Sequence, residues 1–88
     1  MRAAVEISMY PLNADYVARI LAFIGRLNDR GEFTVVTNDL STQIWGDLAR
    51  IMTALGEEIA RAAVDSPQLV FVMKVLPGIQ APSASAAT

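Results

Sequence analysis

Residues 33–46 restrict the fold of this chain more than any other stretch; they read Phe-Thr-Val-Val-Thr-Asn-Asp-Leu-Ser-Thr-Gln-Ile-Trp-Gly. β-Branched and aromatic residues, which favour extended strands, occupy both halves of the stretch, and Asn38-Asp39 separates them. Asn and Asp tolerate the positive φ angles of a tight hairpin turn. The stretch therefore predicts two short antiparallel strands joined by a two-residue loop.

A loop at Asn38-Asp39 decides which side chains share a face, because directly opposed residues of a hairpin point to the same side. With this loop Thr37 would lie opposite Leu40. We expect a mostly apolar, helix-covered face made of Phe33, Val35, Thr37, Leu40, Thr42 and Ile44. The other face would carry Thr34, Val36, Ser41, Gln43 and Trp45.

Further strands are predicted before and after this hairpin. Residues 3–10 alternate between apolar and more polar side chains, with Val5, Ile7 and Met9 on one side and Glu6, Ser8 and Tyr10 on the other. Residues 68–76 are rich in β-branched and apolar residues and predict the last strand.

Two amphipathic helices are predicted between these strands. The first follows Asn13, its expected N-cap, and its expected buried stripe is Val17, Ile20, Leu21, Ile24 and Leu27, widened by Tyr16 and Phe23. The second follows Asp47, also an expected N-cap, and buries Leu48, Ile51, Met52, Leu55, Ile59 and Ala62. We expect Arg50, Glu57, Glu58 and Arg61 to lie largely outside that second stripe.

The resulting order, β-α-β-β-α-β, predicts an α+β fold of the ferredoxin-like type. Short connections and right-handed crossovers place both helices on one face of a four-stranded antiparallel sheet, with the first strand between the third and the fourth. We expect one domain over residues 1–76, followed by a Pro/Ser/Ala-rich tail over residues 77–88.

The size and apolar character of the chain predict self-association. A chain of 88 residues buries only about 60% of its unfolded surface, yet 53% of its residues are hydrophobic. The uncovered sheet face would also carry Val36, Val70 and Val72. We therefore expect a homodimer or homotetramer that assembles through this face.

The composition argues against several functional classes. The net charge is −2 and the seven Lys and Arg are scattered, so nucleic acid is a poor partner. The chain has no Cys and no His, which removes disulfides, thiol chemistry and Cys/His metal sites. The longest apolar run, residues 69–73, is too short for membrane insertion. We expect a cytoplasmic protein that needs no metal or cofactor.

The sequence offers no set of catalytic residues. A serine nucleophile needs a base, and without His the candidates are Lys74 or a carboxylate. Glu57 and Glu58 are adjacent on a helix and diverge by about 100°, so they do not form a glycosidase pair. We therefore expect a non-enzymatic protein.

A cluster of neutral hydrogen-bonding residues instead predicts a ligand site. The cluster consists of Ser8, Thr37, Asn38, Ser41, Thr42 and Gln43, and Tyr10 and Trp45 flank it. Hydroxyl and amide groups can bind the edge of a flat heteroaromatic molecule while aromatic rings stack on its face. Ordinary strand hydroxyls and an interface tryptophan would give the same pattern, so the residues alone leave both interpretations open.

Three short motifs resemble a known family. Ser8-Met9-Tyr10-Pro11, then Thr37-Asn38-Asp39-Leu40-Ser41-Thr42, then Gly46 are similar to the YkoF-like family of thiamine-binding and hydroxymethylpyrimidine-binding domains. The resemblance covers most of residues 4–76 and includes the order of elements. Its tandem members carry two such units, whereas this chain has one.

The resemblance implies a non-enzymatic binder of thiamine or its hydroxymethylpyrimidine precursor, in salvage or transport of vitamin B1. It implies ligand-site roles for the matched residues Ser8, Tyr10, Thr37, Asn38, Ser41 and Thr42. Glu6 or Asp39 could offset the positive charge of a thiazolium ring. The pocket could lie over the open sheet or under the helices.

Two other functions remain open from the sequence. One is a small cofactor-free enzyme of the dimeric α+β barrel type, such as a monooxygenase, for which a closed pocket lined by Trp45 between facing sheets would be expected. The other is a regulatory oligomerisation module without a ligand, in which a dimer interface fills the open sheet face.

Overall fold

Six elements follow one another in the predicted order in a computed structural model that describes residues 1–65 and 68–79. They are β1 (Arg2–Pro11), α1 (Tyr16–Asp29), β2 (Thr34–Thr37), β3 (Thr42–Asp47), α2 (Leu48–Asp65) and β4 (Leu69–Pro77). The predicted last strand therefore ends at Pro77, one residue into the expected tail. The rest of that tail from residue 80 onward lies outside the described residues.

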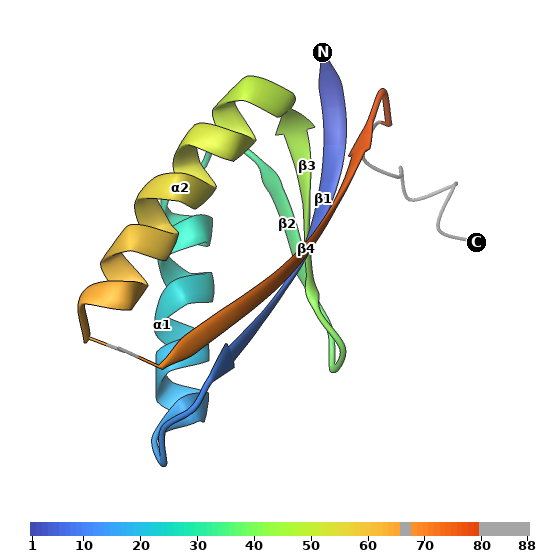
Figure 1. Cartoon of the computed structure of the whole chain (residues 1–88). Coiled ribbons are helices and arrows are strands. Elements are labelled where there is room, and N and C mark those ends of the chain that lie inside the picture. Colours follow the sequence, from blue (N-terminus) through green and yellow to red (C-terminus); the bar gives the residue numbers. More distant parts are fainter. Residues whose placement is uncertain (66–67, 80–88) are drawn as a thin grey trace.

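The four strands form one antiparallel sheet in the order β2-β3-β1-β4, and both helices pack on the same face of it (Figure 1). β1 lies between β3 and β4, as the topology argument predicts. The ferredoxin-like α+β fold is thus confirmed. We call the face without helices the open face.

Alternation along β1 sorts its side chains between the two faces. Val5 and Ile7 are buried in the helix-covered core, whereas Glu6 and Ser8 are half-buried and Tyr10 is exposed on the open face. The core continues across the sheet and into both helices. It consists of Val5, Ile7, Phe23, Leu27, Ile44, Ile51, Leu55 and Ala62.

The hairpin turns one residue later than predicted, between Asp39 and Leu40, so Thr37 pairs with Thr42 and not with Leu40. The side chain of Asn38 explains this, because its Oδ1 accepts hydrogen bonds from the backbone N–H groups of Leu40 (2.8 Å) and Ser41 (3.1 Å). The predicted positive φ is absent, since no described residue other than glycine has one. Relative to the prediction, the β3 partner of each β2 residue lies two positions further along the chain. A shift by an even number of residues leaves each side chain on its predicted face. The exception is Leu40, which is 87% exposed and does not belong to the core.

Helix α1 begins later than predicted and buries a narrower face than predicted. It starts at Tyr16, so Asp15 and not Asn13 occupies the N-cap position, and Asp15 makes no side-chain cap hydrogen bond. Phe23 and Leu27 are buried and Ile20 and Ile24 are half-buried. This is the i, i+3, i+4, i+7 stripe that starts at position 20. Tyr16, Val17 and Leu21, which the prediction placed on the packed face, are exposed.

Helix α2 has the predicted N-cap, because Asp47 Oδ2 accepts a hydrogen bond from the backbone N–H of Arg50 (3.2 Å). Ile51 and Leu55 are buried as expected, but Met52 is 40% exposed. The prediction that Glu58 lies outside the packed face is wrong. It is buried between the helices, and its two carboxylate oxygens pair with Arg26 and Arg30 of α1.

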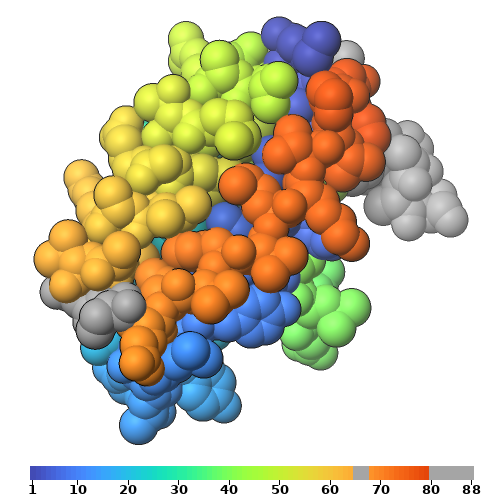
Figure 2. Space-filling view, in the orientation of Figure 1, coloured from blue at the N-terminus to red at the C-terminus, as the bar shows by residue number. Residues whose placement is uncertain are grey.

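Strand β4 lies at the edge of the sheet with apolar side chains exposed along its length. Val70, Val72, Val75 and Leu76 are each between 42% and 52% exposed. The space-filling view shows β4 in orange at the surface beside the helices (Figure 2). The open face and this edge therefore form a large accessible apolar surface.

Candidate functional site

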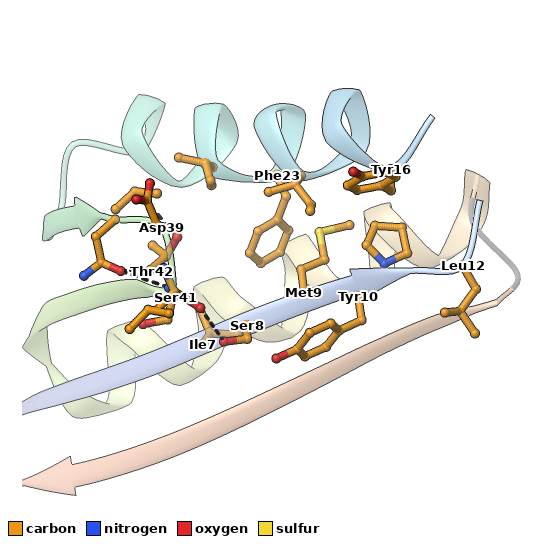
Figure 3. A pocket seen from close by; sticks show the side chains of 16 residues that line it. Ile7, Ser8, Met9, Tyr10, Leu12, Tyr16, Phe23, Asp39, Ser41 and Thr42 are labelled. Atoms are coloured by element: carbon orange, nitrogen blue, oxygen red, sulfur yellow. Dashed lines mark hydrogen bonds between the residues drawn. The ribbon is translucent and has the colours of Figure 1, made fainter. Parts of the chain in front are cut away.

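A cavity of about 380 Å³ lies between α1, the C-terminal end of β1 and the hairpin loop (residues 38–41). Figure 3 shows α1 above it and β1 below it, with the hairpin loop at one end and the start of α1 at the other. The cavity is therefore on the helix-covered side of the sheet. Its lining residues are Ile7–Leu12, Tyr16, Ile20, Phe23, Ile24 and Thr37–Thr42.

Side chains from β1 and from the loop itself hold the hairpin loop in place at one end of the cavity. Asn38 closes the turn through the two backbone hydrogen bonds to its Oδ1. Ser8 donates a long hydrogen bond of 3.4 Å to the backbone carbonyl of Leu40. The Ser41 hydroxyl donates to Glu6 Oε2 (3.1 Å). The loop is thus fastened to β1 by two side chains of the open face.

The hydroxyls of Thr37 and Thr42 contribute a polar spot to the cavity. The two residues are cross-strand partners, and their Oγ1 atoms lie 3.1 Å apart, within hydrogen-bond distance. Thr42 is buried, whereas Thr37 is exposed. Because a hydroxyl can donate once and accept twice, this pair keeps capacity for a further partner.

Apolar and aromatic side chains form the rest of the wall. Phe23 points down from α1, Met9 points up from β1, and Tyr16 lies at the start of the helix (Figure 3). The ring of Tyr10 points to the opposite side of β1, away from α1, so its side chain does not project into the cavity (Figure 3). The Phe23 ring also packs against Phe71 of β4, with a centroid separation of 5.1 Å.

Among the described lining residues, Asp39 in the hairpin loop is the one with a carboxylate. Asp39 is exposed and lies at the loop end of the cavity (Figure 3). None of the described lining residues is a Lys or an Arg. The fixed charge of the cavity is therefore negative.

Six of the nine predicted site residues meet at this cavity: Ser8, Tyr10, Thr37, Asn38, Ser41 and Thr42. Glu6 is outside the lining but contacts it through Ser41. Gln43 and Trp45 lie on the open face, where they are opposite Glu6 and Ala4 of β1.

The structure separates the two aromatic residues that were expected to flank one site. β1 and β3 run antiparallel, so Trp45 pairs with Ala4 near the start of β1, while Tyr10 is six residues further on. At ~3.3 Å per residue this separates them by ~20 Å along the strand. They cannot stack on the same small ligand.

Sequence reasoning missed the contribution of α1 to the cavity. Tyr16, Ile20, Phe23 and Ile24 line it, yet their helical spacing is equally typical of residues that pack in a core. Local spacing therefore gave no signal that these residues line a cavity. Within residues 1–65 and 68–79, no group of three His, Cys, Asp or Glu is placed to hold a metal ion.

Comparisons with solved structures show the same fold in proteins from several organisms. A Streptococcus pneumoniae protein is 25% identical, with a TM-score of 0.83 over 90% of this chain and 89% of that one. A Methanocaldococcus protein is also 25% identical, with a TM-score of 0.74 over 84% and 77% of the two chains. A Thermotoga maritima protein whose name links it to thiamine biosynthesis or salvage is 17% identical, with a TM-score of 0.78 over 86% and 83%.

A comparison with protein families gives a match across nearly the whole described chain. No curated protein matches the sequence. The sequence profile of the YKOF-related family, however, matches residues 2–84. This range contains all six elements and every residue that lines the cavity. The chain therefore belongs to the YKOF-related family.

Proposed function

We propose that this chain binds thiamine or its hydroxymethylpyrimidine precursor without changing it chemically, as part of vitamin B1 salvage or transport. The observation that carries the proposal is the cavity between α1 and the hairpin loop, which combines an apolar wall with hydroxyl groups and one carboxylate. Membership in the YKOF-related family and the name of the Thermotoga maritima protein support it. A cytoplasmic location is part of the same proposal.

The chemistry of the cavity suits such a ligand. A volume of about 380 Å³ is in the range of small-molecule sites. Tyr16 offers an exposed ring against which a planar pyrimidine can stack, and the Thr37–Thr42 hydroxyl pair can bind its nitrogen atoms. Asp39 offers a counter-charge for a thiazolium ring.

The partners of the two serine hydroxyls support binding without catalysis. Ser8 donates to a backbone carbonyl, which cannot take its proton. Ser41 donates to Glu6, a carboxylate that also pairs with Lys74 (3.7 Å). The Glu6 carboxylate is thus already engaged by two partners.

The proposal includes self-association through the open face, as a homodimer or homotetramer. Val36, Val70 and Val72 expose between 43% and 52% of their surface there. A second copy of this chain is the partner that we propose for the open face.

Neither helix of the described chain has the length and apolar character that crossing a bilayer requires.

Isothermal titration calorimetry with thiamine, hydroxymethylpyrimidine and adenine tests the binding proposal. We expect heat of binding with one or both vitamin compounds and none with the purine. Thr37→Val removes a hydroxyl from the cavity and should weaken binding by about 1 kcal/mol, roughly fivefold.

Thr34→Val is the matched control, because it makes the same change on the same strand but on the open face. It should leave the affinity unchanged. Absence of binding to both vitamin compounds at millimolar concentration would refute the proposal. Equal losses in the two threonine variants would show that the ligand does not occupy this cavity.

A further inference from the structure

The distribution of charge around the cavity bears on which form of the ligand it accepts. The hairpin loop places the Asp39 carboxylate in the lining, and the lining contains no described cationic side chain. Recognition of a phosphate group normally uses Arg or Lys, or the N–H groups at the start of a helix. The lining provides the opposite charge.

None of the seven cationic side chains lines the cavity, and most of them form ion pairs elsewhere. Arg19 pairs with Asp15, Arg26 and Arg30 pair with Glu58, and Lys74 pairs with Glu6 on the open face. Moving one of these groups to the cavity would break an ion pair and leave a carboxylate without its partner. They are therefore poor candidates for a mobile phosphate clamp.

The start of α1, at the far end of the cavity, is the remaining place where an anion could bind. Its first residue, Tyr16, belongs to the lining. Asp15 occupies the N-cap position, and the hydrogen bond from the Arg19 side chain holds the pKa of Asp15 below its ordinary range. A carboxylate that is charged at neutral pH thus already occupies the positive end of the helix dipole.

We propose that this cavity selects the unphosphorylated, neutral or cationic form of its heteroaromatic ligand and rejects the phosphate esters, with Asp39 as the residue that determines this preference. The inference rests on the proposed function, since it concerns the same cavity. The protein would then handle the free alcohol, which is the form that precedes phosphoryl transfer to that hydroxyl.

Calorimetry with thiamine, thiamine monophosphate and thiamine diphosphate tests this preference. At low ionic strength, about 50 mM salt, we expect thiamine to bind at least about tenfold more tightly than the monophosphate. In Asp39→Asn the ratio should fall to about threefold or less, because the carboxylate that repels the ester is gone. Hydroxymethylpyrimidine carries no charge and should bind both proteins equally.

Asp29→Asn is the matched control, since it removes one exposed carboxylate from α1 outside the cavity. This variant should show the same ratio of thiamine affinity to thiamine monophosphate affinity as the wild-type protein. Circular dichroism melting of both variants verifies that they fold.

The outcomes separate this inference from the proposed function. Failure of the wild-type protein to bind thiamine and hydroxymethylpyrimidine would overturn both. Binding of thiamine together with equally tight binding of its monophosphate would overturn the preference alone. An unchanged ratio in Asp39→Asn, or an equal change in Asp29→Asn, would overturn the role of Asp39.

Discussion

The hydroxyl of Ser41 donates a 3.1 Å hydrogen bond to Oε2 of Glu6, which links the hairpin loop to the open face of β1. Ser41 lines the cavity, whereas Glu6 lies outside it and pairs with Lys74 of β4 through its other oxygen (3.7 Å). The position of the loop that closes the cavity therefore depends on a residue that does not contact the cavity itself.

Glu6→Ala should loosen this loop. We expect faster hydrogen exchange of the loop amides and a loss of ligand affinity of about 1 kcal/mol, since one hydrogen bond to a charged group is removed at a partly exposed position. Glu6→Gln keeps an acceptor and should retain most of the affinity. Gln43→Ala, which changes the cross-strand neighbour of Glu6, is the control. Exchange rates that remain those of the wild-type loop would contradict the link.

Much of the fold could be predicted from the sequence because the patterns of β1 and of the hairpin are local. Alternation along β1 assigned Val5 and Ile7 to the core and Glu6 to the open face, as observed. The hairpin register could not be predicted in the same way. It depends on the Asn38 side chain, which bonds two backbone N–H groups and moves the turn by one residue. The predicted assignment of side chains to the two sheet faces still held, because the strand partners shifted by an even number of residues.

The candidate site was only partly predictable. Polar residues stand out in strands, and six of the nine residues predicted for the site line the cavity. Tyr16 and Phe23 could not be assigned to it, since a gap between a helix and a hairpin loop leaves no trace in local spacing. Trp45 was grouped with the site although the antiparallel register carries it to the other end of β1.

Replacing Glu58 should destabilise the packing of α1 against α2. Its side chain is 3% exposed and pairs with Arg26 (2.8 Å) and Arg30 (2.9 Å). Glu58→Ala leaves both arginines without this carboxylate, and we expect a loss of about 2–3 kcal/mol in the free energy of unfolding, measured in urea. Glu57→Ala is the control, because its side chain is 54% exposed and should cost less than about 0.5 kcal/mol. Equal losses in the two variants would show that the buried ion pairs of Glu58 add nothing to the free energy of unfolding.

The same carboxylate should make stability depend on pH. Burial alone would raise the pKa of Glu58, but hydrogen bonds from Arg30 and Arg26 outweigh it and hold the pKa below its ordinary value of 4.5. A depressed pKa in the folded state means that the stabilisation is fully present above that ordinary value and is lost as the pH falls through the folded pKa.

Urea unfolding of the wild-type protein and of Glu58→Gln over a series of pH values measures this effect. The difference in free energy of unfolding should be largest near neutral pH and should shrink as the medium becomes more acid than pH 4.5. Glu57→Gln provides the comparison for an exposed carboxylate. A difference that stays constant with pH would exclude the depressed pKa.

Two glycines should respond in opposite directions to the same substitution. A Cβ at Gly46 in β3 would lie 3.0 Å from Cδ1 of Phe33 and 3.7 Å from Ile51, so Gly46→Ala should destabilise the protein by about 1–3 kcal/mol. Gly56 in α2 is exposed and has open space at that position, so Gly56→Ala should stabilise it by about 0.5–1 kcal/mol. Thermal melting of the two variants decides the sign of each effect.

Trp45→Ala should separate self-association from ligand binding. The ring is half-buried on the open face, where its residue pairs with Ala4 and Thr34, and it does not line the cavity. If a second copy covers this face, loss of a large aromatic anchor should weaken the assembly by about 2 kcal/mol, roughly thirtyfold, in analytical ultracentrifugation. Thiamine affinity should stay that of the wild-type protein, provided that each copy carries its own complete cavity. Thr34→Ala, on the neighbouring strand, controls for small changes of this surface. A Trp45→Ala protein of unchanged mass but reduced affinity would place the ligand on the open face, since no contact of this ring reaches the cavity below α1 in the described structure.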